Sequence, residues 1–147
     1  MRRWILPGAV LLCATVLNAA ALEPLNIKTG LWRITMTSNV SSAPKPITST
    51  YDSCVKKEDL AKYPFTDPKD NCNWTVVSST GTQMEAHGTC QPQGMGNVNF
   101  SIKLEAANSE NVKGTGQLTL QGPAGAINGT YSGTAKWINA MCPAGKK

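Results

Sequence analysis

His87 is the only histidine in the chain, so any chemistry that requires an imidazole depends on it. A serine hydrolase would place this histidine between a serine nucleophile and a carboxylate. Glu85 lies two residues away on the same face of a predicted strand, but no serine has the sequence context of a nucleophile elbow. We therefore expect an exposed His87 and a protein that is not an enzyme. A hydrolase built on His87 is the alternative, which substitution by alanine would test.

The carboxylates predict no metal site. Residues 58–59 fall in the one helical stretch, and residues 67–70 lack the regular spacing of oxygen ligands found in a calcium loop. The glycine-rich stretches 93–96 and 122–125 each join two predicted strands, so neither opens a helix whose N-terminus would hold a phosphate. We expect no metal and no cofactor.

Four cysteines follow the N-terminal leader, an even number that favours two disulfides in one of three connectivities. Gly81 lies midway between Cys72 and Cys90, and residues 79–82 read as a hairpin turn, so these two cysteines would face each other across two strands. Zinc is less favoured, because no two cysteines have the C-x-x-C spacing of paired zinc ligands. Pairing the other two by elimination predicts the disulfides Cys72–Cys90 and Cys54–Cys142.

Residues 1–21 read as a secretory signal peptide, with a basic start, an apolar run and a small-residue end at Ala21. The apolar run contains Pro7 and Gly8 and is shorter than the roughly 20 residues of a spanning helix. We expect cleavage near Ala21, removal of Cys13 with the leader, a periplasmic or secreted protein, and no membrane span afterwards.

The remaining chain, residues 22–147, has the length and composition of one globular domain, with 41% hydrophobic and 16% charged residues in the full sequence. Arg2 and Arg3 leave with the signal peptide, so the basic excess becomes small. No stripe of Lys or Arg alternates with aromatic residues, which argues against a nucleic-acid partner.

Strict alternation of apolar and polar residues predicts strand after strand, joined by short segments with Gly, Pro or Asn. Residues 56–63 are the one helical candidate, and Pro64 ends it. The predicted fold is all-β: an antiparallel up-and-down meander of about seven strands, as a curved sheet or small barrel with one short helix. The predicted strands are 30–37, 47–53, 72–78, 83–90, 97–106, 112–121 and 127–138.

Four glycines fall on the apolar face of the predicted sheet, where they either bend it or leave room for a ligand. Bulky residues alternate with them, as around a cleft. A concave face of this kind would bind a small apolar or amphipathic molecule. The four glycines are Gly114, Gly116, Gly129 and Gly133, and the candidate ligand-binding residues are Trp32, Phe100, Tyr131 and Trp137.

The stretches 30–35 and 53–59, together with the spaced cysteines, resemble the exported bacterial domain-of-unknown-function family 3617. Arg33 departs from the Gly-Leu-Trp-Glu that usually opens the first strand of that family. The resemblance implies a bacterial periplasmic setting and no particular activity. More weakly, Gly30-x-Trp32 is similar to the opening of lipocalin-like β-barrels, which hold small apolar ligands.

We therefore expect a non-catalytic periplasmic protein whose partner is a small apolar ligand bound on the concave face. The alternative is an envelope accessory module whose exposed strand edges bind another envelope protein.

Overall fold

The computed structural model of the chain describes residues 22–67, 69–91, 96–123 and 125–144. They form seven strands and one short 3-10 helix. In chain order these are β1 (Gly30–Val40), β2 (Ile47–Val55), the 3-10 helix η1 (Lys57–Asp59), β3 (Cys72–Ser79), β4 (Gln83–Cys90), β5 (Val98–Asn108), β6 (Asn111–Gly122) and β7 (Gly125–Asn139).

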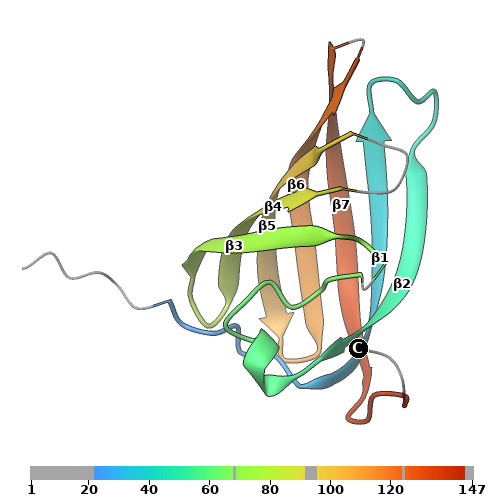
Figure 1. Cartoon of the computed structure of the whole chain (residues 1–147). Helices are drawn as coiled ribbons and strands as arrows, with labels where there is room; N and C mark the ends of the chain where they lie inside the picture. Colours follow the sequence, from blue (N-terminus) through green and yellow to red (C-terminus); the bar gives the residue numbers. More distant parts are fainter. Residues whose placement is uncertain (1–21, 68, 92–95, 124, 145–147) are drawn as a thin grey trace, which may run out of the picture.

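All seven strands belong to one antiparallel sheet in the order β2-β1-β7-β6-β5-β4-β3. The sheet curls strongly, so that β3 crosses in front of the concave side (Figure 1). It does not close, because β2 and β3 each have a single neighbour in the described sheet. The predicted all-β meander is confirmed, in the form of a curved open sheet. The opening lies between β2 and β3, which follow one another in the chain, and residues 56–71 connect these two edge strands.

Two inward glycines allow close approach within the sheet. A Cβ atom on Gly116 would lie 2.6 Å from Cζ of Tyr131, and one on Gly133 would lie 2.6 Å from the carbonyl oxygen of Thr35. Tyr131 is the cross-strand partner of Gly116. Neighbouring atoms therefore occupy the space that these glycines leave, and the glycines serve packing and curvature.

The N-terminal segment 22–29 crosses the lower end of the sheet, where the chain enters β1 (Figure 1). Asn26 N–H donates to the carbonyl of Gly81 (2.8 Å), and Lys28 N–H donates to the carbonyl of Ser109 (2.9 Å). These bonds attach the segment to the β3–β4 and β5–β6 turns. Leu25 and Ile27 of this segment are buried, so the segment covers the lower end of the core.

The connection between β2 and β3 differs from its prediction. The sequence predicts a helix over 56–63, but only Lys57–Asp59 form a helical turn. At the start of this turn the backbone N–H of Lys56 donates a hydrogen bond to the Asp59 carboxylate (2.9 Å). Beyond it, Tyr63 and Phe65 are buried in the concave side. The open sheet leaves apolar surface uncovered between its edges, and burying these two rings removes that surface from water.

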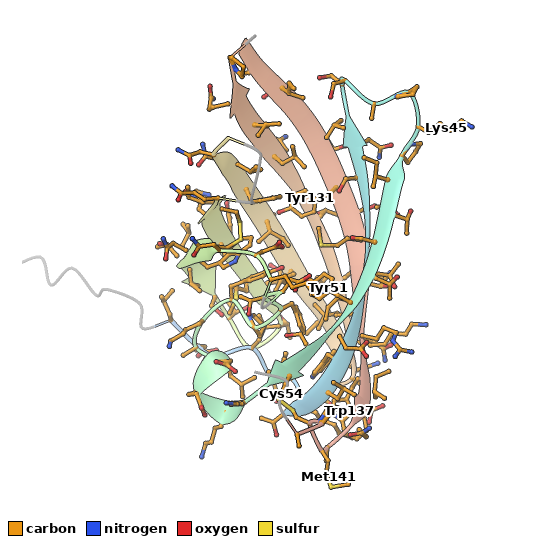
Figure 2. The ribbon with its side chains drawn as sticks, turned by 45° about the vertical axis from the view of Figure 1, so that its right-hand side comes forward. Lys45, Tyr51, Cys54, Tyr131, Trp137 and Met141 are labelled. Atoms are coloured by element: carbon orange, nitrogen blue, oxygen red, sulfur yellow. A yellow bond between two sulfur atoms is a disulfide. The ribbon has the colours of Figure 1, made fainter. Side chains whose placement is uncertain are left out.

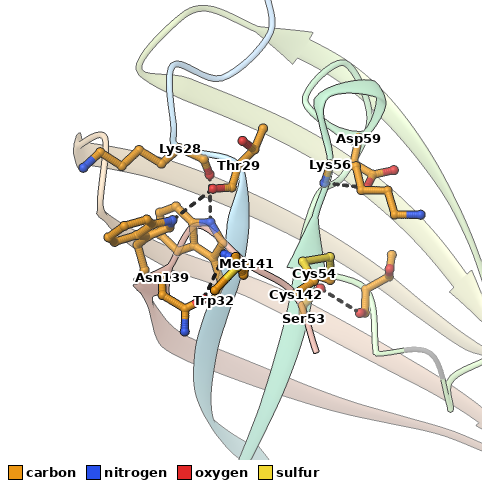
Figure 3. Close-up of a disulfide and its surroundings, with 12 residues drawn as sticks. Lys28, Thr29, Trp32, Ser53, Cys54, Lys56, Asp59, Asn139, Met141 and Cys142 are labelled. Carbon is orange, nitrogen blue, oxygen red and sulfur yellow. Dashed lines mark hydrogen bonds between the residues drawn. A yellow bond between two sulfur atoms is a disulfide. The ribbon is translucent and has the colours of Figure 1, made fainter. Parts of the chain in front are cut away.

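Two disulfides link the chain as predicted. Cys72 and Cys90 are opposite each other on β3 and β4, and a bulge between Val76 and Ser78 shifts the register nearer the turn. The Cys54–Cys142 bond joins β2 to the segment after β7, at the lower end of the sheet (Figure 3).

Several predictions concern residues outside the described ranges. The signal peptide 1–21, its Cys13 and its cleavage near Ala21 are among them, as are residues 93–95 and 124 of the two glycine-rich turns. Among the described helices, none has the length and apolar character needed to cross a membrane.

Candidate ligand-binding cleft

Six aromatic rings form a continuous row across the concave side. Trp32 of β1 begins the row at the lower end, the β2–β3 connection contributes two rings, and β3, β5 and β7 contribute one each. The successive ring centroids are separated by 5.3 Å (Trp32–Phe65), 6.4 Å (Phe65–Tyr63), 4.0 Å (Tyr63–Trp74), 6.0 Å (Trp74–Phe100) and 5.7 Å (Phe100–Tyr131).

The concave side contains two cavities of very different size. An apolar cavity beside Ile34, Ile102 and Val112 has a volume of about 20 Å³, room for about one water molecule. A second cavity, of about 320 Å³, opens between β2, β3 and the connection and lies within the size range of small-molecule sites. We call it the concave cleft. Its described lining residues are Met36, Ser49, Thr50, Tyr51, Tyr63, Phe65, Thr66, Asp67, Asp70, Cys72, Trp74, Cys90, Phe100, Ile102 and Tyr131.

Of the four predicted ligand-binding residues, two line the concave cleft and two lie outside it. Phe100 and Tyr131 line the concave cleft and contact each other edge to face. Trp32 is completely buried beneath the cleft, where its indole N–H donates to the carbonyl of Lys28 (2.9 Å). Trp137 lies at the lower end of β7, far below Tyr131 (Figure 2), and its indole N–H donates to the carbonyl of Thr29 (3.0 Å). Two of the four residues therefore share one cavity.

Four further aromatic residues line the cleft without being among the predicted site residues: Tyr51, Tyr63, Phe65 and Trp74. Trp74 alternates with polar residues on β3, so its inward direction was readable from the sequence. Tyr51 follows the same alternation on β2. Tyr63 lies in a loop, where strand alternation does not apply; the aromatic-Pro-aromatic triplet of residues 63–65 within a hydrophilic stretch was the available signal.

Buried tyrosine hydroxyls hold the walls of the cleft in place. Tyr51 donates to the carbonyl of Phe65 (2.9 Å), which attaches the connection to β2, and Tyr131 donates to the carbonyl of Ser101 (3.2 Å). Burial raises the pKa of both phenols, and it raises that of Tyr63 as well. All three are neutral at physiological pH, so Tyr51 and Tyr131 remain hydrogen-bond donors.

The charges at the cleft are all negative. Asp67 and Asp70 come from the upper part of the β2–β3 connection, and the described lining contains no Lys, Arg or His. The backbone N–H of Lys69 donates to Asp67 Oδ1 (2.9 Å), which fixes that carboxylate in a turn. Burial raises the pKa of Asp70, and the charge of Asp67 raises it further.

The candidate catalytic histidine lies away from the cleft. His87 is exposed on β4, with Thr75 and Ser101 as its cross-strand neighbours. In the part of the chain that the structure describes, no three His, Cys, Asp or Glu side chains are grouped to hold a metal ion.

The fold and the cleft define a class: an all-β protein with one open, disulfide-linked antiparallel sheet curled around an aromatic cleft. The chain belongs to the family described as protein of unknown function (DUF3617), whose model matches residues 27–142. No curated protein and no solved structure matches the chain. The two disulfides are consistent with an oxidising, extracytoplasmic compartment.

Proposed function

We propose that this protein is exported to the bacterial periplasm by the signal peptide 1–21, which is cleaved near Ala21. The mature domain, residues 22–147, binds a small apolar or amphipathic molecule there and catalyses no reaction. Two disulfides support export, because such bonds persist in oxidising compartments.

The concave cleft is the observation that carries the binding proposal. It has a volume of about 320 Å³ and is walled by aromatic rings, while Trp74 and Phe100 remain only partly buried. A ligand would cover the exposed parts of these two rings and remove apolar surface from water, at about 25 cal/mol for each Å² buried. Trp32 and Trp137 then support the fold, and Phe100 and Tyr131 contact the ligand.

Binding of the neutral apolar dye N-phenyl-1-naphthylamine to the purified mature protein tests the proposal. We expect saturable enhancement of dye emission and an apolar adduct in the native mass spectrum of protein isolated from the periplasm. Protein that carries no adduct and does not bind the dye saturably would contradict it.

A pair of variants on one strand locates the dye. Ser49 lines the cleft, so Ser49→Phe should fill part of it and weaken dye binding by about tenfold, the equivalent of about 1.4 kcal/mol. Thr48 is its neighbour on the opposite face, where its hydroxyl bonds to that of Thr37 (3.0 Å), so Thr48→Phe is the matched control. Equal dye affinity in both variants would place the dye elsewhere.

The free edge of β2 supports a second candidate, an envelope accessory module. Ile47 is 56% exposed at the start of this edge strand. The connection reaches β2 lower down, through hydrogen bonds from the side chains of Tyr51 and Ser53. An extended segment of another envelope protein would add a strand beside the upper part of β2.

Photo-crosslinking in intact cells tests the second candidate. A photoreactive residue at position 47 should give one defined product, and the same residue at position 113, an exposed site on β6, should give none. Identical crosslinking from both positions would rule out recognition by the β2 edge.

A further inference from the structure

The concave cleft carries uncompensated negative charge at its rim. Asp67, which is partly buried, and Asp70, which is exposed, belong to its lining, whereas Lys69 between them does not. The described salt bridges are Lys28–Glu110 and Arg33–Asp52, so neither rim carboxylate has a cationic partner among the described residues.

The field of these carboxylates reaches into the cleft. Beyond the effect of burial, Asp67 and Asp70 both raise the pKa of the Tyr51 hydroxyl, which lines the cleft and donates to the carbonyl of Phe65 in the connection that carries them. A tyrosinate there would be repelled by the same negative potential that would attract a cation. Low-dielectric walls around the cleft weaken solvent screening of this potential.

The aromatic walls favour the same sign of charge. An aromatic ring is negative on its face and attracts an ammonium group within about 6 Å of its centroid, most strongly when the ring is that of tryptophan. Trp74 is stacked on Tyr63 with centroids 4.0 Å apart, so its face is not free for a cation and the ring serves as apolar wall. Phe100, whose centroid lies 6.0 Å from that of Trp74, is partly exposed and is the ring available to a cation. An alkylated ammonium group would contact such rings through its methyl groups, which give up little hydration when they bind.

We propose that the concave cleft prefers cationic amphiphiles, with an alkylated ammonium group beside Asp67 and Asp70 and the apolar part among Trp74, Phe100 and Tyr131. This inference rests on the proposed function, because it names the chemical class of the ligand for the same cleft. An anionic ligand would meet two carboxylates and, in the described lining, no basic group, and a neutral ligand would gain nothing from the carboxylates.

Three probes with one alkyl chain and different head groups test the preference. Octyltrimethylammonium, octyl glucoside and octyl sulfate are titrated into the mature protein below micelle-forming concentrations, and tryptophan emission is recorded. We expect the cation to bind about tenfold more tightly than the neutral probe, and the anion more weakly than either. Equal affinity of cation and neutral probe would overturn the inference and leave the proposed function standing. Failure of all three to bind would overturn both.

Neutralising the rim carboxylates assigns the effect to them. The double variant Asp67→Asn/Asp70→Asn keeps the side-chain oxygen that accepts the Lys69 N–H, so the turn is preserved. It should bind octyl glucoside as the parent does and lose the tenfold preference for the cation. Glu23→Gln/Glu58→Gln removes the same net charge at exposed sites outside the lining and should keep the preference. Retention of the preference in the first variant would overturn the assignment.

Discussion

Tyr63 stacks on Trp74 with ring centroids 4.0 Å apart and ring planes 23° from parallel. The first ring comes from the β2–β3 connection and the second from the edge strand β3, so the stack attaches the connection to the sheet that it covers. The same pair forms part of the cleft wall. The Tyr63–Trp74 stack therefore contributes both to the stability of the fold and to the shape of the cleft.

Replacement of Tyr63 by alanine should lower the free energy of unfolding by about 3 kcal/mol, because it removes a large buried ring and leaves a cavity. Urea denaturation measures the change. Tyr63→Phe keeps the stack and should cost less than about 1 kcal/mol, since no described hydrogen bond uses the Tyr63 hydroxyl. Equal losses in the two variants would show that stacking is not the stabilising contact.

The two disulfides should contribute unequally to stability. Cys54–Cys142 closes a separation of 88 residues and Cys72–Cys90 one of 18. In the chain-entropy model the longer loop is worth about 4.6 kcal/mol and the shorter about 3 kcal/mol. Thermal unfolding of the two double-serine variants compares them, and Cys54→Ser/Cys142→Ser should unfold at the lower temperature. A lower temperature for the other variant would contradict the chain-entropy account.

Alkaline pH should unfold the protein through its tyrosines. Tyr51, Tyr63 and Tyr131 are the three tyrosines of the chain, and burial raises the pKa of each above its ordinary value of 10.0. The unfolded chain loses phenol protons first as the pH rises, so the free energy of unfolding is undiminished below pH 10.0 and falls above it.

Tyrosinate absorbance and far-ultraviolet circular dichroism follow this transition together. In the folded protein no tyrosine should ionise near pH 10.0, and ionisation should coincide with loss of the strand signal. Urea-unfolded protein is the control and should titrate at the ordinary value. A tyrosine that ionises there while the strand signal persists would refute the prediction.

Substitution of Gly116 by alanine should destabilise the protein and displace Tyr131 from the cleft wall. The added Cβ would lie 2.1 Å from the carbonyl oxygen of Ser101 and 2.6 Å from Cζ of Tyr131. Overpacking of this kind typically costs about 1–3 kcal/mol. At Gly122 the nearest atom would be 3.6 Å away, so Gly122→Ala is the matched control and should change stability little. Denaturant unfolding measures both, and equal stability would contradict the close approach.

Local patterns were enough to predict the strands and the disulfides. Alternation along residues 97–106 marks one buried and one exposed face, because successive side chains of a strand point to opposite sides. The Cys72–Cys90 pairing was readable because a short turn sets which residues of a hairpin face each other. A bulge near Ser78 shifted the register without separating the cysteines. By elimination, that local pairing also settled the long-range bond.

Tertiary structure decided where the sheet opens and which aromatic residues form the cleft. Alternation places Trp32 and Trp137 on one face, and they are indeed cross-strand partners. Yet Trp32 is completely buried against Phe65, whereas Trp137 is only partly buried at the lower end. The two rings differ in burial because different residues, distant in sequence, cover them.

The sequence by itself therefore determined the strands, their faces and the cysteine pairs, which follow from local geometry. The gap between β2 and β3, and the burial of Tyr63 and Phe65 that covers it, depend on how all seven strands together bring the two edges of the sheet to face each other, which no single local pattern specifies.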